Sequence, residues 1–257
     1  MTLRNHLPTL SLLTATLLLA ACGGGGGGDA TATGGTNTGG GSTTSTDVAS
    51  LQGRWATAST ATPAYTAIVV PDSSSNATSA TAWILANDAS RLVKASASST
   101  QSATGKNYDL ANPANAATDI TAGSYSANLG ASPKSITFSN VLGSTLTLTQ
   151  SDAMSGVAAS VDASGTWKAS AGAVDITWAL TDAGAITGSS TAGCSYTGNT
   201  TTPTTVKLYR VSFTETCSGT ATAFSGIATV NTDKTRLTVT ATTTADAKGT
   251  ALFFVKQ

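Results

Sequence analysis

Apolar and polar side chains alternate along most of the chain after residue 49. Residues 175–181 place Ile176, Trp178 and Leu180 on one face and polar or small residues on the other. Residues 208–213 alternate in the same way, and turn-forming sequences rich in Gly, Asn and Asp separate such segments. A period of two is typical of antiparallel strands that bury one face, so the pattern predicts many short strands joined by turns.

The composition favours strands rather than helices. Thr, Ser and Gly are abundant, only 10% of the residues are charged, and Glu215 is the single glutamate. The long helix formers Glu, Gln and Met are nearly absent, which excludes a helical bundle. We therefore predict an all-β fold with two small antiparallel meander barrels or sandwiches, one in residues 49–157 and one in residues 158–257.

Four short patterns occur twice in the same order, which favours a tandem duplication of one β unit. The pairs are Gly53-Arg54-Trp55 with Gly165-Thr166-Trp167, Trp83-Ile84-Leu85 with Trp178-Ala179-Leu180, Lys106-Asn107-Tyr108-Asp109-Leu110 with Lys207-Leu208-Tyr209-Arg210-Val211, and Leu146-Thr147-Leu148-Thr149 with Leu237-Thr238-Val239-Thr240. Each half has enough residues for six to eight strands around a core of its own.

Residues 1–21 have the pattern of a bacterial export signal, because Arg4 precedes an apolar run that ends in small residues. The run is too short to span a bilayer as a mature helix. It ends in Leu19-Ala20-Ala21-Cys22, which resembles the lipobox of bacterial lipoproteins. The resemblance implies a diacylglyceryl group on the Cys22 sulfur, removal of residues 1–21, and stable anchoring by several acyl chains. The alternative is an ordinary secretory signal that leaves Cys22 free.

The residues after Cys22 bear on location. Aspartate at the next position tends to retain Gram-negative lipoproteins in the inner membrane, and here that position is Gly23. The resemblance therefore implies an outer-membrane anchor, with the protein facing either the periplasm or the cell surface. Residues 22–48 are Gly, Thr, Ser, Ala and Asn with few charges and no apolar period. We predict that they form a disordered tether with a reach of about 28 Å.

The Gly-x-Trp tripeptides at Gly53 and Gly165 resemble the sequence that opens the first strand of lipocalin barrels. In that family a basic residue of the last strand packs over the tryptophan, and Arg236 is the candidate in the second half. The resemblance implies an architecture and does not establish a ligand.

Two cysteines, Cys194 and Cys217, remain once Cys22 carries lipid. Exported proteins fold in an oxidising compartment, and a hairpin would place these two residues on neighbouring strands. We therefore predict one disulfide, which stabilises the folded chain by about 3 kcal/mol in the chain-entropy model.

The chain offers little material for catalysis. Its single histidine, His6, lies in the predicted signal, so a Ser-His-Asp triad, a Cys-His pair and an imidazole metal site are excluded. Removal of residues 1–21 takes away only Arg4 and leaves 12 basic residues against 13 acidic ones, which argues against nucleic acid as a partner. We expect no enzyme activity, no cofactor and no metal site. A hydrolase that uses carboxylates alone remains an alternative.

Aromatic residues supply the candidates for binding. Alternation assigns most of them to the core, among them Trp83, Trp178, Tyr209 and Phe213. Tyr65 follows a loop at residues 59–63, and Tyr125 lies among the small residues Gly123, Ser124 and Ser126. We predict that both tyrosines are exposed and are candidates for ligand binding. The sequence thus indicates a lipid-anchored, non-catalytic envelope protein that binds an unknown protein or small molecule. A lipocalin-like carrier of a small apolar ligand is the alternative.

Overall fold

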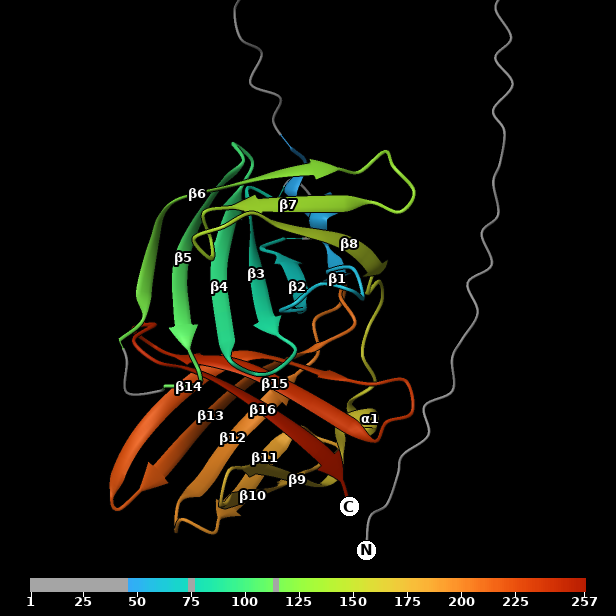
Figure 1. Cartoon of the computed structure of the whole chain (residues 1–257). Helices are drawn as coiled ribbons and strands as arrows, with labels where there is room; N and C mark the ends of the chain where they lie inside the picture. Colours follow the sequence, from blue (N-terminus) through green and yellow to red (C-terminus); the bar gives the residue numbers. More distant parts are fainter. Residues whose placement is uncertain (1–45, 74–76, 113–115) are drawn as a thin grey trace, which may run out of the picture. The chain divides into compact units, whose positions relative to one another are not determined.

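The computed structural model describes residues 46–73, 77–112 and 116–257, and their strands form two closed eight-stranded antiparallel barrels (Figure 1). In each barrel, strands that follow one another in sequence are neighbours in space, and the last strand pairs with the first. The prediction of two all-β meander units is confirmed, and both are barrels. The predicted signal, Cys22 and residues 23–45 of the tether lie outside the described residues.

The first barrel is closed by pairing of β1 with β8. A 3₁₀ turn precedes its eight strands. The elements are η1 (Val48–Leu51), β1 (Gly53–Ala56), β2 (Tyr65–Pro71), β3 (Ser79–Ala86), β4 (Arg91–Ser98), β5 (Ser102–Asp109), β6 (Thr118–Asn128), β7 (Ser135–Ser139) and β8 (Leu146–Asp152).

The second barrel repeats this order and is closed by pairing of β9 with β16. A helical turn again precedes the first strand. The elements are α1 (Ser160–Ala163), β9 (Gly165–Ala171), β10 (Val174–Leu180), β11 (Ala185–Ser190), β12 (Ser195–Thr201), β13 (Tyr209–Cys217), β14 (Thr220–Val230), β15 (Arg236–Thr243) and β16 (Gly249–Lys256). None of the helices in the described ranges is long and apolar enough to span a bilayer.

The folded part of the chain begins earlier than the composition predicts. The tether predicted from composition extends to residue 48, yet Val48 is fully buried and belongs to the core of the first barrel together with Leu51. Asp47 caps η1 by accepting a hydrogen bond from the Ala49 amide at 3.1 Å. The alternation rule missed this segment because a single helical turn buries residues with a spacing of three rather than two.

The two Gly-x-Trp tripeptides occupy equivalent places. Trp55 and Trp167 are fully buried on the first strand of each barrel. Each indole Nε1 donates to a backbone carbonyl four residues earlier, to Leu51 at 3.0 Å and to Ala163 at 2.7 Å. Both barrels therefore begin with a helical turn that is tied to the buried tryptophan of the first strand.

The other three matched sequence patterns are out of structural register, although Tyr108 and Tyr209 of the third both lie on the fifth strand of their barrel. Trp83 lies on the third strand of its barrel whereas Trp178 lies on the second strand of the other. Tyr108 packs on the outside of the first barrel, but Tyr209 packs inside the second. The architecture is repeated, and only the Gly-x-Trp match is in structural register.

A third apolar cluster joins the outer faces of the two barrels, and the described part of the chain is one compact unit. Strands β2 and β3 bury both of their faces over much of their length, so they lack the simple alternation of half-buried strands. Trp83 is buried as predicted, but in this outer cluster rather than inside a barrel. The cluster consists of ten buried residues: Ile68, Val70, Trp83, Leu85, Leu92, Tyr108, Met154, Val206, Leu208 and Ile227.

Candidate functional site

Side chains fill the interiors of both barrels. In the second barrel Trp178 lies with its ring centroid 5.0 Å from that of Phe213 and 4.8 Å from that of Phe254. In the first barrel the buried core includes Trp55, Phe138 and the η1 residue Leu51. A lipocalin-like carrier needs interior space of several hundred cubic ångströms, and the described interiors are occupied by the protein's own side chains.

An open cleft of about 270 Å³ lies instead on the outer faces, where both barrels contribute residues. We call it the arginine cleft, because Arg54 of β1 and Arg236 of β15 both line it. Its apolar lining continues the cluster that joins the barrels. The apolar side chains are Ile68, Trp83 and Leu85 from the first barrel and Ile227 and Phe253 from the second.

The residues that line the arginine cleft carry a positive formal charge. Arg54 also lines the neighbouring smaller cleft, together with Asp152 and Asp162. No Asp or Glu occurs among the lining residues of the arginine cleft itself, and neither arginine forms an ion pair with any residue in the described ranges. The Nε atom of Arg54 is buried and has no hydrogen-bond partner there. A buried donor without an acceptor destabilises the folded protein by about 1–3 kcal/mol. A ligand that supplies an acceptor to Arg54 would remove this cost.

Strand alternation explains why Arg54 points outward. Its neighbour Trp55 points into the first barrel, and successive side chains of a strand face opposite sides. Arg236 is likewise outward because Leu237 beside it belongs to the core of the second barrel. The sequence indicates the outward direction of both arginines, since each lies next to an apolar residue of the buried face. The sequence does not indicate that the two arginines line one cleft, because 182 positions separate them.

The structure corrects the role predicted for Arg236. The basic residue that packs over Trp167 is Lys256 of the last strand, with its Nζ atom 5.2 Å from the indole centroid. Register explains this contact, because Lys256 lies directly opposite Trp167 in the β9–β16 pair. In the first barrel Gln150 occupies the corresponding position opposite Trp55, where it donates to the Gln52 carbonyl at 3.0 Å.

Trp83 connects the arginine cleft to a second, larger cleft. The second cleft has a volume of about 570 Å³, and its lining includes Asp72, Lys94 and Arg210. The Lys94 ammonium lies 5.4 Å from the Trp83 ring centroid, within the range of a cation–π contact. Since Trp83 lines both clefts while the other three tryptophans are fully buried, its fluorescence would report on ligands.

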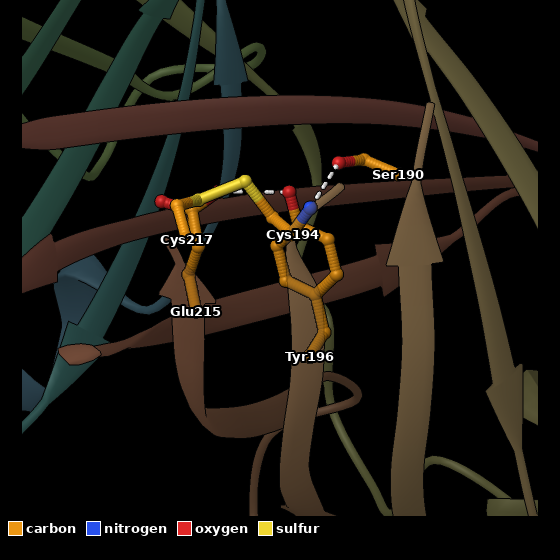
Figure 2. The surroundings of a disulfide bond; sticks show 5 residues. All are labelled: Ser190, Cys194, Tyr196, Glu215 and Cys217. Carbon is orange, nitrogen blue, oxygen red and sulfur yellow. Dashed lines mark hydrogen bonds between the residues drawn. A yellow bond between two sulfur atoms is a disulfide. The ribbon is translucent and has the colours of Figure 1, made fainter. Parts of the chain in front are cut away.

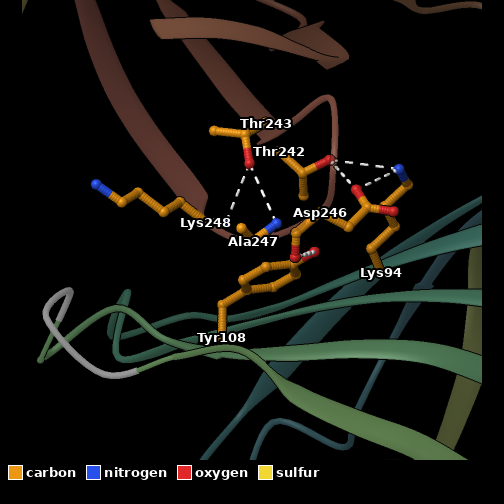
Figure 3. A network of polar contacts seen from close by, with 7 residues as sticks. All are labelled: Lys94, Tyr108, Thr242, Thr243, Asp246, Ala247 and Lys248. Atoms are coloured by element: carbon orange, nitrogen blue, oxygen red, sulfur yellow. Dashed lines mark hydrogen bonds and ion pairs between the residues drawn. The ribbon is translucent and has the colours of Figure 1, made fainter.

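A polar network fixes the barrels beside these clefts (Figure 3). Lys94 of β4 forms an ion pair of 2.8 Å with Asp246, which follows β15, and also donates to Thr242 at 3.3 Å. Thr242 donates to the same carboxylate at 2.6 Å. Tyr108 donates to the Asp246 carbonyl at 3.1 Å, and its ring packs so closely on Gly249 that an added Cβ would lie 2.6 Å from ring carbon Cγ.

Burial and charge in this network shift two pKa values in opposite directions. Burial alone would raise the pKa of Asp246, but hydrogen bonds from Lys94 and Thr242 outweigh it and lower the pKa below its usual value. The pKa of Tyr108 is raised, mainly by burial of its hydroxyl and further by the Asp246 charge. At neutral pH the network therefore holds an ionised carboxylate and a neutral phenol.

The predicted disulfide is confirmed, and it joins Cys194 to Cys217 (Figure 2). Cys194 immediately precedes β12 and Cys217 ends β13, so the bond links neighbouring strands. Tyr196 donates to Glu215 at 2.8 Å beside it, and burial raises the pKa of this tyrosine. The two sulfur atoms and the Glu215 carboxylate lie within 4.8 Å of one another. Sulfur atoms bonded to each other are not thiolates, so this group offers a metal only one ordinary ligand.

The two tyrosines predicted to bind ligand have different surroundings. Tyr125 is buried in the first barrel, and its hydroxyl donates to the Ser98 carbonyl at 2.6 Å, so its predicted exposure is wrong. The serines on either side of it, Ser124 and Ser126, take the outward positions of β6. Tyr65 is only partly buried and lines an open depression of about 890 Å³ with Arg91, Leu142 and other residues. The structure does not bring Tyr65 and Tyr125 together in one cleft.

Two carboxylates, Asp152 and Asp162, line a smaller cleft of about 170 Å³. Asp162 forms an ion pair of 2.6 Å with Lys234, and Asp152 accepts a hydrogen bond from the Met154 amide at 2.8 Å. A carboxylate-only hydrolase needs one carboxyl with a raised pKa. Where a carboxyl pKa in the described ranges is clearly shifted, it is lowered: these are Asp72, Asp88, Asp175 and Asp246.

A scan against models of known protein families, a search of curated proteins and a search of solved structures found no match for this chain.

Proposed function

We propose that this chain is a lipid-anchored, non-catalytic protein of the bacterial outer membrane that binds a small molecule in the arginine cleft. The lipobox-like Leu19-Ala20-Ala21-Cys22 supports the anchor. One observation carries the binding role. The barrel interiors are filled, whereas an open cleft with an apolar lining lies where the two barrels meet. Small-molecule sites commonly combine such a lining with a few placed polar groups.

The size of the cleft favours a small molecule over a protein partner. Its volume of about 270 Å³ is at the lower end of the range of roughly 300–1,000 Å³ that is usual for ligand sites. Phe253 of β16 is 43% exposed although it lines the cleft, so a ligand would cover apolar surface that now faces water. The free energy gained from that burial is the driving force for binding.

The anchor is tested by replacing Cys22. We expect Cys22→Ala to move the protein from the membrane fraction to the soluble fraction or the culture medium, because no acyl chain can then be attached. Separation of cell fractions followed by immunoblotting measures this. Cys194→Ala, which removes a cysteine of the disulfide, is the matched control and should leave the protein in the membrane fraction. Retention of the Cys22→Ala protein in the membrane would contradict the anchor.

The cleft is tested with a neutral aromatic probe, 1-naphthalenemethanol, by NMR titration and Trp83 fluorescence. We expect the largest spectral changes at Ile227 and Phe253, and we expect Phe253→Ala to weaken binding about 3- to 30-fold because it removes most of an apolar contact surface. Val255→Ala is the control, because Val255 faces outward on the same strand, is 46% exposed and does not line the cleft. Equal effects of the two variants would argue against this site.

A further inference from the structure

The polar groups of the arginine cleft indicate which chemical class of ligand it accepts. A ligand held only by apolar contacts would leave two guanidinium groups without partners at the edge of a lining that contains no carboxylate. Arginine presents five N–H donors in a planar fork and no acceptor, and this fork matches the two oxygens of a carboxylate. Charge complementarity therefore favours an anion.

The surroundings of the two arginines strengthen this point. The Nε atom of Arg54 is buried without a hydrogen-bond partner among the described residues. Arg236 is exposed, and its backbone amide is held by the Asn231 side-chain oxygen at 2.9 Å. The backbone at the start of β15, where Arg236 lies, is thus fixed by local hydrogen bonds, while the Arg236 guanidinium forms no ion pair within the described ranges. Neither guanidinium forms an ion pair within the described ranges, and the Nε atom of Arg54 has no hydrogen-bond partner there.

The remaining polar lining is also better suited to an acceptor than to a donor. The Asn87 side-chain oxygen accepts a hydrogen bond from Thr66 at 3.0 Å, and the Asn231 oxygen accepts from two backbone amides. The Asn231 oxygen is therefore fully engaged, and the Asn87 oxygen has used one of its two acceptor positions. A ligand that brings its own acceptors, as a carboxylate does, fits what the cleft leaves open.

We propose that the arginine cleft binds a small apolar carboxylate, such as a bicyclic aromatic acid or a short-chain fatty acid. Its apolar part lies against Trp83, Ile227 and Phe253, and its carboxylate is bound by Arg54 and Arg236. This inference rests on the proposed ligand-binding function of the same cleft, and it adds the charge and the size of the ligand.

The test compares 1-naphthoate with the neutral 1-naphthalenemethanol, two probes of similar size and shape. The protein is the chain from position 22 to its end with Cys22→Ser, which retains every described residue. We expect 1-naphthoate to bind at least about tenfold more tightly, because a charge-assisted hydrogen bond is stronger than a neutral one. Titration calorimetry and Trp83 fluorescence measure both dissociation constants.

The arginine variants locate the anion. Arg54→Gln and Arg236→Gln should each weaken 1-naphthoate binding about 5- to 20-fold and leave binding of the neutral probe within about twofold. Arg91→Gln is the matched control, because Arg91 lies on the same barrel as Arg54 but lines a different depression. If Arg54→Gln fails to fold, Arg54→Lys retains the charge without the fork and should give an intermediate loss.

The outcomes separate the two proposals. Equal affinity for both probes, with no effect of the arginine variants, would overturn the carboxylate inference and leave the apolar cleft as a binding site. Preference for 1-naphthoate that survives both arginine variants would overturn the inference as well, because the anion would then bind elsewhere. If neither probe binds at millimolar concentration, the proposed function fails together with the inference.

Discussion

The two barrels have the same strand order but fill their interiors differently. The described core of the first barrel contains three aromatic side chains and seven alanines, whereas that of the second contains seven aromatic side chains and five alanines. Small side chains leave room in the first barrel, and Val48 and Leu51 of η1 add to its core. The second barrel fills its interior mainly with aromatic side chains of its strands, receives only Ala163 from α1, and carries the disulfide. An eight-stranded meander thus closes around a core rich in small aliphatic side chains or around one rich in aromatic rings.

The outer faces differ as well, and this difference creates the candidate site. Strands β2 and β3 of the first barrel carry Ile68, Trp83 and Leu85 on the outside, where they line the arginine cleft. Strands β9, β10 and β13 of the second barrel alternate a buried residue with an exposed one, as β10 does from Ile176 to Leu180. An apolar outer face needs a partner, and the partner in the described part of this chain is the other barrel.

The largest effect is expected when the aromatic core of the second barrel is broken. Trp178→Ala removes a fully buried ring and should lower the free energy of unfolding by about 3–5 kcal/mol, as measured by urea titration with circular dichroism. Thr177→Ala, at an exposed position of the same strand, should change it by less than about 0.5 kcal/mol. Similar losses in the two variants would mean that the aromatic cluster is not the main support of this barrel.

Loss of the disulfide should have the next largest effect and should be confined to the second barrel. The double variant Cys194→Ala/Cys217→Ala opens a loop with a sequence separation of 23, which costs about 3 kcal/mol in the chain-entropy model. Dithiothreitol should destabilise the natural protein and have no effect on the variant. Tyr108 and Trp83 of the first barrel should keep their NMR shifts, and changes there would show that the disulfide also supports the contact between barrels.

The smallest of these effects concerns the network that joins the barrels. Asp246→Asn removes the charge that pairs with Lys94 and should cost about 1 kcal/mol, a modest value because both side chains are about a third exposed. The folded state lowers the pKa of Asp246 from 3.8, so this contribution is present above about pH 4 and disappears as the pH falls through the lowered pKa. Urea titrations between pH 2.5 and 7 should therefore show a smaller acid loss for Asp246→Asn. An unchanged pH dependence would exclude Asp246 as its source.

Much of the fold follows from local patterns in the sequence. Alternation located β10 and β13, and it assigned Trp178, Tyr209 and Phe213 to a core. It failed at Tyr125, where small and polar neighbours indicated exposure although the tyrosine takes the inward position of β6. The neighbours of a residue in sequence do not decide which face of a strand it occupies. Its position in the inward–outward alternation of the strand does.

The disulfide was predictable because it joins residues on consecutive strands of one hairpin. The candidate cleft was not. Arg54 appeared only as the middle residue of a Gly-x-Trp motif, and Arg236 was assigned to a tryptophan that Lys256 covers. The register of β9 with β16 decides that contact, and a register between the first and last strands of a barrel has no local sequence signal.

The sequence by itself determined the all-β class, the two meander units, the pairing of Cys194 with Cys217 and the buried faces of β10 and β13. These features depend on interactions between residues that are close in the chain or on a simple period. Only the tertiary structure decided that η1 adds to a barrel core, that Trp83 lies outside a barrel, and that Arg54 and Arg236 reach one cleft. Those features depend on contacts between strands that are distant in sequence and between the outer faces of the two barrels. The free energy that stabilises such contacts comes from side-chain packing and not from local strand propensity.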